Sequence, residues 1–141
     1  MRIGIIDGQG GGIGKYITER LRKELSPNLE IIALGTNALA TAAMLRAGAN
    51  DGASGENAIS QTAPTLDLII GSLAIITANS FLGELTPTMA AAIAGAPGKK
   101  LLLALGRGNL EVIGGSTEPF PHQVDLLIKR LKSEWSVECG E

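Results

Sequence analysis

The sequence predicts a three-layer α/β protein built on a Rossmann-like parallel sheet. One observation is the alternation along the chain of short apolar runs with amphipathic segments, which is typical of parallel strands joined by helices. A second is a glycine-rich run, residues 8–14, that lies between the first apolar run and the first amphipathic segment. Right-handed crossovers between such units give a strand order of about 3-2-1-4-5 in a single domain, residues 1–141.

Each predicted strand is a short segment bounded by turn residues. The first is uninterrupted in its apolar character, as expected when helices cover both faces of the sheet. The predicted strands are residues 3–6, 30–34, 51–54, 66–70 and 101–105. A tight turn at residues 106–109, followed by residues 110–113, predicts an antiparallel hairpin at the edge of the sheet.

The helices are predicted from apolar spacing and from capping residues. After the glycine run, apolar side chains recur at every fourth position, at Ile13, Ile17, Leu21 and Leu25. Thr36 or Asn37 is placed to cap a second helix, and Thr86, followed by Pro87, to cap a later one. Further helices are expected at residues 56–63 and from about residue 121. Residues 73–85 fit either a helix or an irregular apolar segment.

Composition excludes several classes of function. With 141 residues the chain is long enough to bury about 68–70% of its unfolded surface. The apolar fraction of 45% and the charged fraction of 18% are typical of a compact globular protein and not of a disordered one. A net charge of −2 and only 3% aromatic residues provide neither a basic patch nor stacking platforms. Nucleic acid is therefore not an expected partner.

The sequence indicates a cytoplasmic location. One cysteine, Cys139, allows no disulfide within the chain, which suits a reducing compartment. The N-terminal apolar run is broken at Asp7, so it is no signal peptide, and residues 66–78 are too polar for a membrane span. A single histidine, His122, leaves no His/Cys metal site and is expected to be a surface or capping residue.

The glycine-rich run is the strongest functional signal. A strand that leads into such a turn and then into a helix directs unpaired backbone N–H groups and the positive end of the helix dipole at one point. The residues predicted to surround a bound phosphate or other anion are Gly8, Gln9, Gly10, Gly11, Gly12, Ile13 and Gly14. The alternative is a purely structural role, a tight turn that packs the helix against the strand.

The pattern G-x-x-x-G-I-G, formed by Gly8, Gly12, Ile13 and Gly14, resembles the cofactor loop of short-chain dehydrogenases. That resemblance implies a nucleotide or dinucleotide such as NAD(P). The chain lacks the Tyr-x-x-x-Lys pair of that family, because Arg20 stands four residues after its only tyrosine. It also lacks an acidic residue for the ribose at the end of the second strand, where Gly35-Thr36-Asn37 stands. A P-loop is excluded by Gln9 and Tyr16 at positions where that motif requires Gly and Ser/Thr.

A second group of polar residues is expected to face the same crevice. In open parallel sheets, ligands bind beyond the carboxyl ends of the strands, where the strand order reverses. The residues expected there, besides the glycine run, are Thr36, Asn37, Ser72, Asn79 and Glu84. Helix caps and turn hydrogen bonds would satisfy these side chains as well as a ligand would, and both interpretations stay open.

Over its full length the chain looks like a small bacterial family known only as a domain of unknown function. Three segments carry this resemblance: I-D-G-Q-G-G-G-I-G-K, A-L-G-T-N-A-L-A-T and A-N-S-F-L-G-E-L-T-P. It implies no activity. It does imply that the three segments form one site or one structural core.

The leading hypothesis is a cytoplasmic protein that binds a nucleotide or another phosphorylated small molecule at the glycine run. No catalytic residue is identified. One alternative is a small enzyme that uses Glu84 or Asp7 as acid or base. Another is an interaction module that forms a homo-oligomer through alanine-rich helices such as residues 89–96, with a structural glycine loop.

Overall fold

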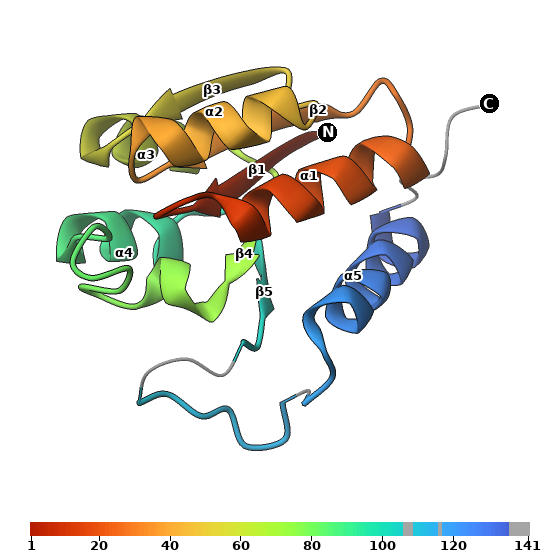
Figure 1. The fold of residues 1–141 in the computed structure, drawn as a ribbon. Coiled ribbons are helices and arrows are strands. Elements are labelled where there is room, and N and C mark those ends of the chain that lie inside the picture. Colours follow the sequence, from red (N-terminus) through yellow and green to blue (C-terminus); the bar gives the residue numbers. More distant parts are fainter. Residues whose placement is uncertain (106–108, 116, 136–141) are drawn as a thin grey trace.

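The computed structural model describes residues 1–105, 109–115 and 117–135. Five parallel strands form one sheet in the order β3-β2-β1-β4-β5, which confirms the predicted topology (Figure 1). The strands are β1 (Arg2–Asp7), β2 (Glu30–Gly35), β3 (Asp51–Ser54), β4 (Leu68–Ser72) and β5 (Lys99–Leu103). Because the order reverses between β1 and β4, their carboxyl ends form the switch point where ligands bind in such sheets.

Helices cover both faces of the sheet, as the apolar strands require. They are α1 (Gly12–Glu24), α2 (Ala38–Arg46), α3 (Glu56–Thr62), α4 (Pro87–Ala94) and α5 (Phe120–Trp135), with short 3₁₀ helices η1 (Ala63–Thr65) and η2 (Leu73–Ile76). Alternate residues of β1 face opposite layers: Ile3 and Ile5 pack with α1, α2 and α5, and Ile6 packs with α3 and α4. The central strands are therefore buried on both sides.

Two predicted helix caps are confirmed. Asn37 Oδ1 accepts a hydrogen bond from the Ala40 amide at 2.9 Å, so Asn37 is the cap of α2. Thr86 Oγ1 accepts from the Met89 amide at 3.1 Å and caps α4, which begins at Pro87. Each such cap contributes about 1 kcal/mol to helix stability.

The predicted edge hairpin is wrong. Residues 109–115 form an irregular segment, closed by a hydrogen bond of 2.9 Å from the Gly115 amide to the Val112 carbonyl. Within the part of the chain that is described, β5 pairs with β4 alone. The apolar residues that indicated a strand have exposed side chains instead, with Ile113 86% exposed. Most of the predicted turn, residues 106–108, and Cys139 lie outside the described residues.

The ambiguous segment from residue 73 to residue 85 begins as η2 and then continues as a series of turns. Several non-glycine residues there adopt the left-handed backbone region, including Asn79, Phe81 and Leu82. The segment thus returns over the carboxyl edge of the sheet before α4 begins. None of the helices described is long and apolar enough to cross a bilayer.

Candidate functional site

The glycine loop, residues 8–14, meets two other segments at the carboxyl edge of the sheet. Glu84 Oε1 accepts hydrogen bonds from the Gln9 amide at 2.7 Å, from Thr36 Oγ1 at 2.7 Å and from Asn37 Nδ2 at 3.0 Å. Asn37 Nδ2 also donates to the Gln9 carbonyl at 3.0 Å. Three of the predicted site residues, from two segments distant in sequence, therefore donate to the carboxylate of a fourth, Glu84.

Asp7, the last residue of β1, holds the two ends of the glycine loop. Its Oδ1 accepts from the Gly8 amide at 2.8 Å and its Oδ2 from the Gly14 amide at 2.7 Å. The side chain is only 2% exposed. Because backbone donors surround this buried carboxylate, its charge is compensated within the loop and is not directed at the crevice.

The glycines of the loop serve two different purposes. Gly11 has φ 76°, and a Cβ there would lie 2.7 Å from the Cα of Ala40, so only glycine lets α1 and α2 approach this closely. At Gly14 a Cβ would lie 2.5 Å from Met44 Sδ. At Gly10 and Gly12, by contrast, a Cβ would meet no atom within 4 Å. The fold requires the first pair, whereas the second pair leaves the backbone open to solvent.

The open side of the loop presents backbone donors. Among the described residues, the amides of Gly10, Gly12 and Ile13 have no hydrogen-bond acceptor, whereas the Gly11 and Lys15 amides donate within the loop. Gly12 and Ile13 begin α1, a helix of 13 residues, so their amides lie at the positive end of its dipole. The arrangement can accept an anion from the solvent side without displacing a side chain.

The Glu84 carboxylate is held in its charged form. The hydrogen bonds from the Thr36 hydroxyl and then from the Gln9 amide lower the pKa of Glu84 below its ordinary value; burial opposes them, and the Asn37 hydrogen bond adds a smaller lowering effect. Its Oε2 has no hydrogen-bond partner in the described part of the chain. One oxygen is thus occupied by the protein, and the other is left to accept.

Ser72 and Asn79 do not join this cluster. Ser72 Oγ accepts from the Ala74 amide at 3.3 Å and caps η2, and Asn79 lies in the left-handed region with its amide donating to the Leu85 carbonyl at 2.7 Å. Both line a hollow of about 420 Å³ next to the loop, and Gln9 and Ile13 line it as well.

Phe81 lies at the site although the sequence did not predict it there. A Cβ on Gly8 would lie 2.8 Å from the Phe81 ring and 2.8 Å from Thr36 Oγ1, so the ring lies directly over the start of the loop. The chain has only two phenylalanines, and one of them two residues before Gly83, in a segment with Asn79 and Glu84, was a usable signal. Its place over the loop depends on the left-handed turns, which sequence patterns do not reveal.

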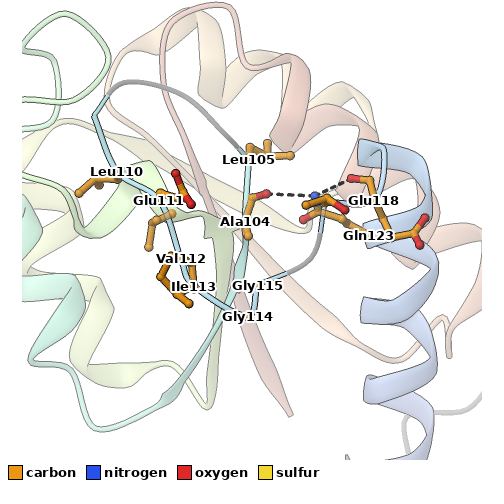
Figure 2. Close-up of a pocket in the computed structure, with 12 residues that line it drawn as sticks. Ala104, Leu105, Leu110, Glu111, Val112, Ile113, Gly114, Gly115, Glu118 and Gln123 are labelled. Atoms are coloured by element: carbon orange, nitrogen blue, oxygen red, sulfur yellow. Dashed lines mark hydrogen bonds between the residues drawn. The ribbon is translucent and has the colours of Figure 1, made fainter.

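A second hollow, of about 480 Å³, lies at the end of β5 and is shown in Figure 2. Residues 110–115 and the start of α5 form its other walls. In it, Gln123 Nε2 donates to the carbonyls of Ala104 and Glu118. His122 lies beside it with an exposed ring, its Nδ1 3.2 Å from Glu118 Oε2, in agreement with a surface role. Throughout the described residues, no group of three or more His, Cys, Asp or Glu side chains is placed to hold a metal ion.

Comparison with protein families gives one match. The model of a domain of unknown function, DUF3842, matches residues 2–136. The chain belongs to the DUF3842 family. A comparison with curated proteins finds no match.

Proposed function

We propose that this DUF3842 protein binds a nucleotide, or another phosphorylated small molecule with a free sugar hydroxyl, at the carboxyl ends of β1 and β2. The observation that carries the proposal is the convergence of Gln9, Thr36 and Asn37 on the Glu84 carboxylate beside an open glycine loop. It brings an anion-binding element and a hydroxyl-binding element into one crevice.

The phosphate position is the N-terminus of α1. The amides of Gly10, Gly12 and Ile13 have no acceptor among the described residues, and a Cβ on either glycine would enter open space. A phosphate oxygen can approach such a backbone closely and gains from the helix dipole. Asp7 does not oppose binding, because the Gly8 and Gly14 amides compensate its charge.

The sugar position is Glu84. Nucleotide sites of this fold have an acidic residue at the end of the second strand, which accepts from the ribose 2′-hydroxyl. The sequence has none at Gly35-Thr36-Asn37, but Glu84 reaches this place from the segment before α4 and is bound to Thr36 and Asn37. Its Oε2 can accept a hydroxyl. A ligand with a phosphate at that position would meet a second negative charge and bind less well.

A binding role is better supported than an acid–base role. The lowered pKa of Glu84 makes its carboxylate a weaker base at neutral pH, and Asp7 is buried under backbone donors. No second titratable group faces Glu84 among its hydrogen-bond partners, which are an amide, a hydroxyl and a carboxamide. A carboxylate fixed in this way suits recognition of a hydroxyl.

Thermal denaturation with a ligand panel tests the proposal. The panel contains AMP, ATP, NAD⁺, NADP⁺, FAD, coenzyme A and sugar phosphates. A ligand present at 100 times its dissociation constant should stabilise the fold by about 2.7 kcal/mol. We expect stabilisation by nucleotides with a free 2′-hydroxyl, and NAD⁺ should bind more tightly than NADP⁺. Absence of stabilisation by every phosphorylated ligand would reject the proposal.

Two substitutions locate the ligand. Gly12→Val adds a side chain in open space, so the variant should fold normally and lose affinity for the phosphate. Glu84→Gln should lose discrimination between AMP and 2′-deoxy-AMP. Glu56→Gln is the matched control, because the Glu56 carboxylate binds Thr86 of the neighbouring segment and not the glycine loop. Unchanged affinity in a folded Gly12→Val protein would remove the loop from the site.

A further inference from the structure

Strand β5 is the outermost strand on one side of the sheet and, within the described residues, pairs with β4 alone. Its centre is apolar, and Leu101 and Leu102 are only half-buried, whereas every residue of β4 is buried. The outermost strand on the opposite side, β3, has the sequence Asp-Gly-Ala-Ser and carries no large apolar side chain. The sheet therefore ends in a polar strand on one side and in an apolar strand on the other.

The outer side of β5 presents backbone groups to which a further strand can bind. The Lys99 amide donates to the Asp67 carbonyl at 3.2 Å, on the side of β4. Because successive residues of a strand direct their N–H and C=O groups to opposite sides, those of Lys100 and Leu102 point outward. In the described part of the chain, these two residues make no backbone hydrogen bond outside the sheet. Another strand can pair there without disturbing the pairing with β4.

The apolar surface continues from β5 onto α5. Leu126 of α5 is 52% exposed and lines a groove together with Leu101 and Leu102. Exposed leucines beside an unpaired strand are unfavourable in water, and such a surface is suited to association with another chain.

The charges at the two ends of β5 determine which strand fits. Lys99 and Lys100 begin the strand, and neither forms an ion pair within the described residues. Lys99 Nζ lies 5.7 Å from the centre of the Trp135 ring, and Lys100 Nζ donates to a backbone carbonyl. Beyond the other end of the strand, the exposed Glu111 lines the hollow shown in Figure 2. Like charges would meet in a parallel pair of two such strands, whereas an antiparallel pair brings the lysines of each towards the glutamate of the other.

We infer that β5 pairs antiparallel with β5 of a second copy of this chain, so that the two sheets join into one across a two-fold axis. An axis that pairs the whole strand passes at Leu101, and Lys100 of each copy then exchanges both backbone hydrogen bonds with Leu102 of the other. The leucines of each copy cover the groove of the other. The homo-oligomer expected from the sequence thus forms at β5 and not at the alanine-rich helix α4. This inference goes beyond the proposed function and does not depend on it.

Sedimentation velocity of the full-length protein over a range of concentrations tests the inference, and the wild type should be a dimer. Leu102→Pro removes an outward N–H group and places the proline ring against the incoming strand. Because this N–H group does not point towards β4, the variant should fold, as circular dichroism can verify, and should sediment as a monomer.

An exchange of charges keeps the test decisive even if Leu102→Pro does not fold. Lys99→Glu and Glu111→Lys should each raise the dimer dissociation constant about tenfold, since the symmetry places each change at the interface twice. The double variant should dimerise like the wild type. Lys23→Glu is the matched control, because Lys23 is an exposed residue near the end of α1, and it should leave the dimer unchanged.

Three results would each overturn the inference. One is a wild type that stays monomeric at about 1 mM. Another is a dimer that persists in folded Leu102→Pro. The third is a double charge variant that dimerises as weakly as the single variants.

Discussion

The glycine loop and the hollow at the end of β5 lie at the same edge of the sheet and are built in different ways. At the loop, backbone and side-chain donors surround two carboxylates, Asp7 and Glu84, and further amides have no acceptor among the described residues. In the hollow at the end of β5, apolar side chains such as Leu73, Leu105 and Val112 form most of the lining, and Gln123 connects Ala104 to Glu118. The first region is built from polar hydrogen bonds and the second mainly from apolar contacts, so the two ends of one sheet edge differ in chemistry.

The two hollows also share residues. Leu73, Leu105 and Leu110 line both the hollow beside the loop and the hollow at the end of β5. These side chains separate the polar end of the crevice from the apolar end. The difference in chemistry therefore arises over a short distance, from the residues on either side of a common leucine wall.

The largest expected effect comes from Asp7, which holds the two ends of the glycine loop. Asp7→Ala removes a buried carboxylate that accepts from the Gly8 and Gly14 amides, so the free energy of unfolding should fall by about 3 kcal/mol. Urea denaturation measures this change. A loss below about 0.5 kcal/mol, the usual range of a surface substitution, would show that the carboxylate does not organise the loop.

A pair of glycine substitutions sharpens the distinction between the packed and open sides of the loop. Gly11→Ala should destabilise the protein by about 2 kcal/mol, because the new Cβ meets the Ala40 backbone and φ is positive. Gly10→Ala should change stability by less than about 0.5 kcal/mol, since its Cβ enters open space. Thermal or urea unfolding of both variants provides the comparison, and equal effects would contradict it.

The Glu84 contacts give a pH-dependent effect. Because the folded-state pKa of Glu84 is lowered, its contribution to stability is present at neutral pH and is lost as the pH falls below the ordinary value of about 4.3 and through the lowered one. The difference in unfolding free energy between the wild type and Glu84→Gln should therefore shrink on acidification. Urea unfolding at neutral pH and near pH 3 measures it. A difference that stays constant or grows would be inconsistent with these contacts.

The smallest expected effect concerns the segment over the loop. Leu82 has φ 56° and is 96% exposed, so its side chain contributes little packing while its backbone is strained. Asparagine tolerates this conformation better, and Leu82→Asn should stabilise the protein by about 0.5 kcal/mol in urea unfolding. Destabilisation by a similar amount would show that Leu82 makes a packing contribution that its exposure does not reveal.

Much of the fold could be predicted from local patterns. The fourfold apolar spacing after the glycine loop predicted α1, and the cap at Asn37 and the pair Thr86-Pro87 located α2 and α4. The predicted edge hairpin was wrong, because the apolar residues 110–113 lie in an irregular segment with exposed side chains and do not pair with β5. A short apolar run does not by itself distinguish a strand from an irregular segment.

The site was only partly predictable, and the reason is distance along the chain. The sequence by itself determined a parallel α/β protein, the glycine loop after β1 and the absence of an acidic residue in the segment after β2. Only the tertiary structure decided that Glu84, 48 positions after Thr36, supplies a carboxylate at that place, and that Gln123 connects the end of β5 to the start of α5. Local sequence patterns show the periodicity of a helix or strand and the residues that cap it. Which side chains meet at the sheet edge depends on how left-handed turns and helix packing return the chain to it.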